Sequence, residues 1–244
     1  DFTIATINKP MSLLQAAQFL DTVVRLEHLP RDDLPEIAFV GRSNAGKSSA
    51  INRLCDRKRL AYASKTPGRT QALNLFSVRL PGAEGHRDES GRLIPMWVGR
   101  LVDTPGYGYA EAPLHTKAQW DGLAGRYLQS RKNLRAVVLI SDIRRGLTKL
   151  DEDLLYWIAN DIPVLVLLTK ADKLGHQDRL RALKNMRAAM QSDLREAGPS
   201  QTVQSTNSSA DCLLFSATQS IGLDETREVL TRWLVPASEK DALV

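Results

Sequence analysis

Residues 37–49 read Ile-Ala-Phe-Val-Gly-Arg-Ser-Asn-Ala-Gly-Lys-Ser-Ser, an apolar run followed directly by a glycine-containing loop. The loop has the spacing of the phosphate-binding P-loop, and the apolar pattern of a helix follows it at Ile51, Leu54 and Cys55. A strand, this loop and a helix in that order predict a site for a nucleoside triphosphate. A chance glycine-rich turn is the alternative, and both the full spacing and the flanking elements disfavour it.

The loop offers several kinds of group to phosphate. Two glycines permit backbone conformations that turn successive N–H groups toward the oxygens, and the positive end of the following helix adds to the attraction. We predict that Lys47 places its charge on the β- and γ-phosphates and that the Ser48 hydroxyl binds the accompanying Mg²⁺. The predicted nucleotide-binding residues of this loop are Gly41, Arg42, Ser43, Asn44, Ala45, Gly46, Lys47, Ser48 and Ser49.

A second apolar strand ends in Asp103-Thr104-Pro105-Gly106. We expect Asp103 to support Mg²⁺ from the far side and the Gly106 N–H to meet the γ-phosphate, so that this loop responds to the presence of that phosphate. Taken alone, the string is an ordinary turn. Its place after a strand and downstream of a P-loop favours a nucleotide contact, to which Thr104 and Pro105 also belong.

Residues 164–172 are a fully apolar strand that runs into Thr169-Lys170-Ala171-Asp172. A carboxylate at Asp172 can accept two hydrogen bonds from the N1–H and exocyclic amine of guanine, a pair of donors that adenine lacks. Because an unpaired buried carboxylate is costly, this residue can discriminate between the bases. We expect the stem of Lys170 to lie along the base. The ligand predicted is therefore GTP or GDP, and a strand end with a charged turn is the weaker alternative.

A weaker signal comes last in the chain, where Leu213 and Leu214 lead into Phe215-Ser216-Ala217-Thr218. A backbone N–H from residues 215–217 is expected to approach the O6 atom of guanine.

These motifs together resemble the EngB family, also called YihA or YsxC, of the TrmE-Era-EngA-EngB-septin-like P-loop GTPases. They read GRSNAGKSS at 41–49, DTPGYGYA at 103–110, LTKAD at 168–172 and FSAT at 215–218, with SKTPGRTQALNLF at 64–76. The family's members are bacterial GTP-binding proteins implicated in assembly of the large ribosomal subunit and in normal cell division and septation. The resemblance implies a Mg²⁺-dependent GTPase switch whose partner is the large ribosomal subunit or its precursor, through rRNA and ribosomal proteins.

The resemblance also assigns the first switch, which comprises Gly68, Arg69, Thr70, Gln71 and Ala72. It makes Thr70 the second hydroxyl ligand of Mg²⁺, so the implied metal ligands are Ser48, Thr70 and Asp103. The implied catalytic residues are Lys47, Thr70 and Gly106. The residues alone indicate only a loop with a glycine and a hydroxyl, and they do not separate Thr70 from Thr66 or Thr104.

Three positions bear on hydrolysis and on departures from the wider GTPase pattern. Thr169 stands where many GTPases have asparagine, which should alter the bond between this loop and the P-loop. Tyr107 stands where Ras-like proteins orient the attacking water with glutamine, so hydrolysis is expected to be slow without a partner. Asn44 matches an asparagine that some relatives use to bind K⁺. A local turn hydrogen bond is the alternative role for Asn44.

Two other functions remain open from the residues. A P-loop ATPase or nucleotide kinase would not use Asp172 to read the base. A nucleotide-gated scaffold for division proteins would need binding but not hydrolysis.

The pattern of elements predicts an α/β fold with a mostly parallel six-stranded sheet and helices on both faces. The P-loop and the family resemblance imply a three-layer P-loop NTPase of the Ras-like G-domain type. The motifs then fall at the carboxyl ends of strands, where such sheets bind ligands. We predict an N-terminal extension with an amphipathic helix at 1–34, the G domain at 35–236 and a tail at 237–244. The segment 81–95 is expected to form a hairpin-like excursion, and 198–210 a loop.

The 244 residues carry a net charge of +5 and two cysteines, Cys55 and Cys212. Two separated cysteines do not indicate a disulfide framework, and no apolar stretch reaches membrane-spanning length, so we expect a cytoplasmic monomer without a membrane anchor. The positive charge suits an RNA-rich partner. Basic clusters at 53–59, 126–135 and 179–187 could form one face for it, although each also fits a solvated helix surface.

Overall fold

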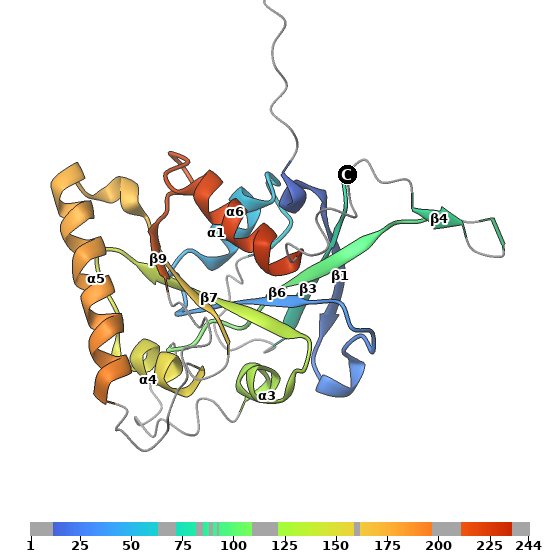
Figure 1. Ribbon diagram of the computed structural model, residues 1–244, viewed down its shortest axis with the longest axis horizontal. Helices are drawn as coiled ribbons and strands as arrows, with labels where there is room; N and C mark the ends of the chain where they lie inside the picture. Colours follow the sequence, from blue (N-terminus) through green and yellow to red (C-terminus); the bar gives the residue numbers. More distant parts are fainter. Residues whose placement is uncertain are drawn as a thin grey trace, which may run out of the picture.

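The computed structural model describes residues 12–62, 72–81, 85–87, 90–91, 93–108, 122–158, 162–196 and 211–235. Its main sheet has seven strands in the order β1-β3-β6-β2-β7-β8-β9 (Figure 1). The strands are β1 Ala17–Val23, β2 Glu36–Gly41, β3 Leu73–Arg79, β6 Trp97–Asp103, β7 Leu134–Asp142, β8 Val164–Thr169 and β9 Asp211–Leu214. Strand β3 pairs antiparallel with both neighbours, and the remaining pairs are parallel.

Helices cover both faces of this sheet (Figure 1). The α-helices are α1 Lys47–Leu54, α3 Leu123–Ser130, α4 Lys149–Ile158, α5 His176–Glu196 and α6 Leu223–Leu234. Short 3₁₀ helices are η1 Leu13–Ala16, η2 Leu26–His28 and η3 Ala171–Lys173. Helices α1 and α6 pack on one face, while α3, α4 and α5 pack on the other.

Successive residues of one strand enter different cores. In β7, Val138 and Ile140 join the cluster under α1 and α6, whereas Val137 and Leu139 join the cluster under α3 and α4. Successive side chains point to opposite faces, and both faces are covered, so the strand sequence is continuously apolar instead of alternating. The three-layer α/β prediction is confirmed.

Two details of the fold prediction were wrong. The main sheet has seven strands instead of six, and the segment predicted as an N-terminal amphipathic helix forms η1 and strand β1. Strand β1 pairs with β3 from Ala17↔Val78 to Val23↔Leu73 and so extends the sheet that we assigned to residues 35–236. Apolar residues at Phe19, Leu20 and Val23 fitted a helical spacing, but the unpaired edge of β3 and the preference of Phe, Thr and Val for strands favour the sheet.

The predicted excursion at 81–95 is confirmed as an antiparallel pair, β4 His86–Arg87 and β5 Leu93–Ile94. Helix α3 begins at Leu123, directly after Gly122, whose backbone is extended. Cys55 and Cys212 are both buried and unpaired. The expected loop at 198–210 and tail at 237–244 lie outside the described residues. No described helix combines the length and apolar character needed to cross a bilayer.

The strand register brings the motifs to one edge of the sheet. Phe39 of β2 lies opposite Asp103 of β6, Gly41 opposite Ile140 of β7, and Asp142 opposite Thr169 of β8. The carboxyl ends of these parallel strands therefore end together, and the loops that follow them meet above the sheet.

Candidate nucleotide site

The loop between β2 and α1 owes its shape to three backbone positions. Gly41 has φ +154°, and a Cβ there would lie 2.6 Å from the carbonyl oxygen of Ile140, so a side chain would collide with β7. Asn44 and Gly46 both have positive φ, 64° and 106°. The first helical bond runs from the Ala50 N–H to the Gly46 carbonyl (2.9 Å), so the N–H groups of residues 47–49 have no carbonyl one turn earlier in the helix to accept them. This geometry suits an anion.

Lys47 and Asp103 lie in direct contact. The Lys47 ammonium, from the first turn of α1, forms an ion pair with the Asp103 carboxylate at the end of β6; Asp103 is buried and Lys47 is partly buried. Burial raises the pKa of Asp103, while the charge of Lys47 opposes that shift. Lys47, predicted to bind phosphate, and Asp103, predicted to bind Mg²⁺, are therefore in contact. Ser48 follows Lys47 in the first turn of α1.

The loop after β6 lies against the P-loop. The Ser43 N–H donates to the Tyr107 carbonyl (3.0 Å), and the Tyr107 N–H donates to the Gly41 carbonyl (3.3 Å). A Cβ on Gly106 would lie 3.0 Å from Ser43 Oγ, which explains why this position suits glycine. The Thr104 hydroxyl donates to the Phe39 carbonyl (2.9 Å). The structure thus brings together residues 103–106 and the P-loop, as predicted.

The end of β8 is also fastened to the P-loop. The Thr169 hydroxyl lies 2.5 Å from the Ala45 carbonyl and 3.0 Å from the Ser141 carbonyl. The Lys170 ammonium donates to the Asn44 carbonyl (2.8 Å) and pairs with Asp142 (2.9 Å). A threonine in place of asparagine thus still ties this loop to the P-loop, through a hydroxyl.

The two predicted base-reading loops meet at Asp172. The Ser216 hydroxyl donates to Asp172 Oδ1 (2.7 Å), and this bond, with Lys173 nearby, keeps the pKa of Asp172 below its usual value. The N–H of Ala171 donates to the Phe215 carbonyl (3.1 Å). Asp172 is thus ionised and oriented at neutral pH.

The prediction for residues 215–217 is narrowed by their internal hydrogen bonds. The Phe215 N–H donates to the Leu168 carbonyl (2.9 Å), and the Ser216 N–H donates to the Ile221 carbonyl (3.0 Å). The Phe215 ring is buried in the core under α6. Of the three backbone donors, the N–H of Ala217 has no acceptor within the described part of the chain, so the predicted contact with guanine O6 is narrowed to this group.

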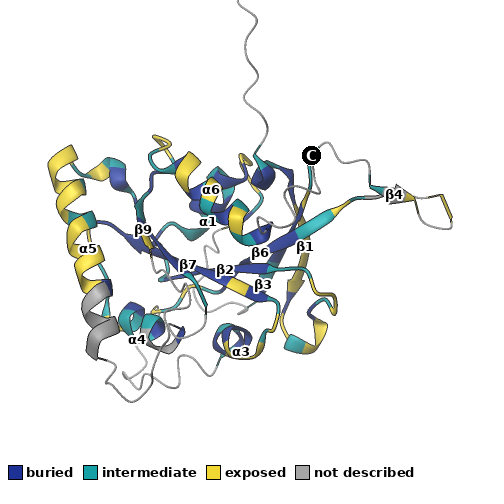
Figure 2. Ribbon diagram, in the orientation of Figure 1, coloured by how far each residue is buried: buried dark blue, intermediate teal, exposed yellow. Residues whose placement is uncertain are grey.

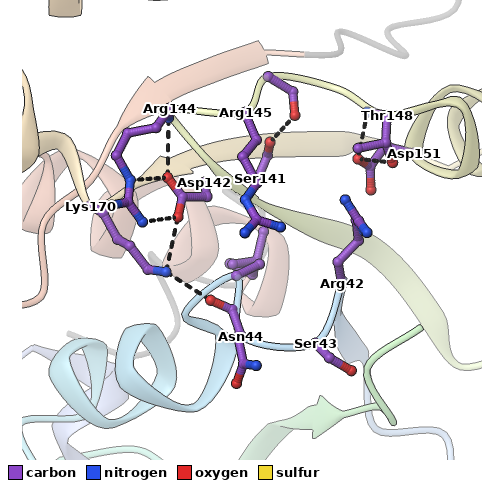
Figure 3. Close-up of a pocket in the computed structure, with 13 residues that line it drawn as sticks. Arg42, Ser43, Asn44, Ser141, Asp142, Arg144, Arg145, Thr148, Asp151 and Lys170 are labelled. Atoms are coloured by element: carbon purple, nitrogen blue, oxygen red, sulfur yellow. Dashed lines mark hydrogen bonds and ion pairs between the residues drawn. The ribbon is translucent and has the colours of Figure 1, made fainter. Parts of the chain in front are cut away.

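Sequence reasoning missed a group of charged residues beside the P-loop. A cavity of about 80 Å³ lies between residues 42–45 and the segment after β7, and the Arg145 side chain points into it (Figure 3). Asp142 accepts two hydrogen bonds from the Arg144 guanidinium (3.0 and 2.7 Å) and one from the Arg144 N–H (3.1 Å), and these bonds, with Lys170, hold the pKa of Asp142 well below its usual value. The available signal was an apolar run at 136–140, followed by Ser141 and then by Asp142, which resembles the ends of the other site strands.

The Tyr107 hydroxyl is hydrogen-bonded to the protein and is not available to orient a water molecule as a glutamine would. It donates to Asp151 Oδ1 of α4 (2.5 Å), and the other Asp151 oxygen accepts from the Thr148 N–H (2.8 Å) and hydroxyl (2.7 Å). Burial, followed by the charge of Asp151, raises the pKa of Tyr107 well above its usual value. The tyrosine thus joins the 103–108 loop to α4.

Of the predicted first switch, the structure describes only the last residue. Gly68, Arg69, Thr70 and Gln71 lie outside the described residues, and Ala72 directly precedes β3. Within the described ranges, no group of three or more acidic, histidine or cysteine side chains could hold a metal by itself. Mg²⁺ commonly takes one or two protein ligands together with phosphate and water. One hydroxyl from Ser48 and one carboxylate from Asp103 fit that coordination preference.

Comparison with known proteins agrees with this geometry. The model of a family described as "50S ribosome-binding GTPase" matches residues 36–170, over half of the chain. The "Probable GTP-binding protein EngB" of Paraburkholderia phymatum is 46% identical over 94% of this chain and 95% of its own length. Its counterpart from Bordetella pertussis is 44% identical over 93% and 98%.

A solved structure supports the fold. The crystal structure of Era in complex with MgGDPNP and nucleotides 1506–1542 of 16S ribosomal RNA aligns with a TM-score of 0.54 at 19% identity, over 82% of this chain and 57% of that one. At that identity, the likeness shows the fold alone. The curated relatives show more, because they are much more similar and match along nearly their whole length. From its sequence motifs, its site geometry and these relatives, the chain belongs to the EngB family of GTPases.

Proposed function

We propose that this protein is a Mg²⁺-dependent GTP/GDP switch that acts in assembly of the large ribosomal subunit. The observation that carries the nucleotide part is the convergence of three loops on one sheet edge: the P-loop, the Asp103 loop and the Asp172 loop. The Asp103 loop and the Asp172 loop are each hydrogen-bonded to the P-loop, as described above. The ribosomal part is supported by the description of the matched family, 50S ribosome-binding GTPase.

Each end of the site has a separate task. Asp172, held by Ser216, accepts the N1–H and amine of guanine, and Ala217 donates to O6. Lys47 and the N–H groups of the P-loop hold the β- and γ-phosphates. Ser48 and Asp103 would hold Mg²⁺, which neutralises charge that develops on the phosphates during transfer. Thr70 remains the proposed second hydroxyl ligand from the first switch.

The Lys47–Asp103 ion pair supports a simple switching mechanism. When Lys47 contacts phosphate, its charge is shared with the nucleotide, and Asp103 would then be free to hold Mg²⁺ together with Ser48. The adjoining Gly106 N–H is then positioned by the same strand end. Loss of the γ-phosphate removes the group that the Gly106 N–H contacts. The loop can then return to the conformation in which Asp103 is paired with Lys47.

Hydrolysis needs a group other than Tyr107, which is bonded to Asp151. Asn44 is our candidate for binding K⁺, because its exposed side chain makes no hydrogen bond within the described part of the chain and its backbone is held by Lys170. We expect GTP turnover to be faster in K⁺ than in Na⁺ buffer, and Asn44→Ala to abolish the difference. Equal rates in both salts, with and without ribosomal subunits, would leave Asn44 a structural role.

We place this activity in the cytoplasm and expect the protein to act as a monomer. A defect in cell division and septation would then follow from a shortage of large subunits. The alternative of a nucleotide-gated scaffold for division proteins predicts full function from a variant that binds GTP but does not hydrolyse it.

The function is tested by measuring affinity for GTP, GDP, ATP and XTP by calorimetry, with and without Mg²⁺, followed by co-sedimentation with large ribosomal subunits in each nucleotide state. The proposal expects guanine selectivity and association that differs between GTP and GDP. Equal binding of ATP and GTP would overturn the nucleotide assignment. Nucleotide-independent association with subunits would overturn the switch.

A further inference from the structure

A second concave site lies beyond the carboxyl end of α1, away from the nucleotide loops. It is a groove of about 470 Å³ between β1 and the loop after α1, lined by Ala17, Gln18, Phe19, Arg57, Lys58, Arg59 and Leu60. The lining thus contains three consecutive cations and no acidic residue. All three cations are exposed, and among the described residues none of them has a salt-bridge partner. Their charge is available to an external anion.

The cationic loop is fixed by α1. The Asn52 side-chain oxygen accepts hydrogen bonds from the Leu60 and Ala61 N–H groups, each 2.8 Å, and its amide donates to the Ala61 carbonyl (2.7 Å). The Arg57 N–H donates to the Asn52 carbonyl (2.8 Å). The partly buried Asn52 therefore fixes the conformation of this loop in the unbound protein, which lowers the entropic cost of binding a ligand.

The opposite wall of the groove presents an aromatic ring. Phe19 is 56% exposed although it lies on a strand, and its ring meets Phe76 in an edge-on contact with centroids 6.2 Å apart. Strand β1 is the last strand at its edge of the sheet, and its middle residues are exposed (Figure 2). A β-bulge follows Phe19. The ring is thus supported from below and open on its outer face.

We infer that this groove binds single-stranded RNA, with phosphates on Arg57, Lys58 and Arg59 and a base stacked on Phe19. The inference deepens the proposed function and rests on it for the identity of the RNA as ribosomal. Cations that track a backbone and an aromatic ring that stacks a base are the two parts of a sequence-tolerant single-strand site. An acidic protein segment would use the cations but has no need of a supported open ring.

The test uses the full chain, a fluorescein-labelled twelve-nucleotide oligouridylate and salt-washed large ribosomal subunits. The triple variant Arg57→Gln/Lys58→Gln/Arg59→Gln should bind the oligonucleotide at least tenfold more weakly, and the slope of log affinity against log salt should fall by about 2, or roughly 0.7 for each lost phosphate contact. Phe19→Leu should weaken binding about tenfold through lost stacking, with the salt slope unchanged. Affinity for GDP and the thermal midpoint verify folding.

A matched control is Lys132→Gln/Arg135→Gln/Lys184→Gln, which removes the same charge from exposed positions outside the groove. It should keep most of the affinity. Equal losses of oligonucleotide affinity in both triple variants would overturn the assignment of the groove as the RNA site, because the protein's overall positive charge would then explain the binding. Unchanged oligonucleotide binding in the groove variants would overturn it as well, as would capture of polyglutamate in preference to RNA.

The subunit arm separates this inference from the proposed function. If the wild type binds subunits and the groove variants bind equally well, the groove is overturned and the proposed function stands. If the wild type does not bind subunits in any nucleotide state, the proposed function fails. The oligonucleotide result alone then decides whether the groove is an RNA site.

Discussion

The two ends of the site, which we propose for guanine and for the γ-phosphate, are held in different ways. At the guanine end, the side chains of Thr169 and Lys170 bond directly to P-loop carbonyls at 2.5–2.8 Å, and Ser216 orients Asp172. At the γ-phosphate end, the loop around Gly106 contacts the P-loop through longer bonds of 3.0–3.4 Å and through one tyrosine bound to α4. The proposed base-reading end is therefore preorganised, whereas the loop that we propose senses the γ-phosphate is held by few contacts that a ligand can replace.

The largest effect is expected from Lys47→Ala, which affects the phosphate end. It removes the phosphate cation and leaves the buried Asp103 carboxylate without its partner, so GTP binding should be lost. The free energy of unfolding of the nucleotide-free protein should fall by about 3 kcal/mol. Calorimetry and urea denaturation measure the two effects.

The double variant Lys47→Ala/Asp103→Asn separates these effects. It should recover most of the stability, because no buried charge remains, yet it should still not bind GTP. If Lys47→Ala alone is as stable as the wild type, the ion pair has no energetic role in the fold.

The next largest effect is expected from Asp172→Asn at the guanine end. An amide cannot accept both guanine donors, so affinity for GTP should fall about 100-fold, in line with the cost of leaving polar partners unpaired in a specific site. Affinity for XTP should rise, since xanthine presents a carbonyl where guanine has its amine. Retention of GTP selectivity in calorimetric titrations would show that another group reads the base.

Thr169→Val tests the fastening of the guanine end. It keeps the shape of the side chain but removes the hydroxyl shared by the Ala45 and Ser141 carbonyls, and should lower the free energy of unfolding by about 1–3 kcal/mol. Affinity for GTP and GDP should fall together, because the base and the phosphate loop lose their common tie. A selective loss of GTP binding alone would contradict this role.

The smallest effect is expected from Tyr107→Phe, which releases the phosphate-side loop from α4. Losing one hydrogen bond of about 1 kcal/mol should speed GDP release by about fivefold, measured with a fluorescent GDP. Tyr127→Phe is the control, because Tyr127 donates to the buried Glu36 (2.8 Å) at the opposite end of β2. It should lower stability without changing the release rate. Equal changes in both variants would mean that Tyr107 does not restrain the loop specifically.

The sequence predicted much of this site and less of its supporting contacts. The sequence signals for the P-loop, Asp103 and Asp172 are local. Each is a short pattern, either the spacing of glycines or a polar residue directly after an apolar strand, and backbone geometry gives that pattern its meaning. Asp142 and Asp151 were missed because their partners Lys170 and Tyr107 lie on other elements, far away in the sequence. Strand β1 was missed because a short apolar segment fits both helical and strand spacing, and the edge of β3 decides between them.

The sequence by itself thus determined the layered α/β fold and the order of loops that approach a nucleotide, since continuously apolar strands must be buried on both faces and glycines permit the phosphate loop. Tertiary structure decided which atoms meet: the pairing of Lys47 with Asp103, the bond between Tyr107 and Asp151, and the groove where Phe19 faces three cations. The physical reason is that such contacts depend on strand register and side-chain direction, which bring together residues far apart along the chain.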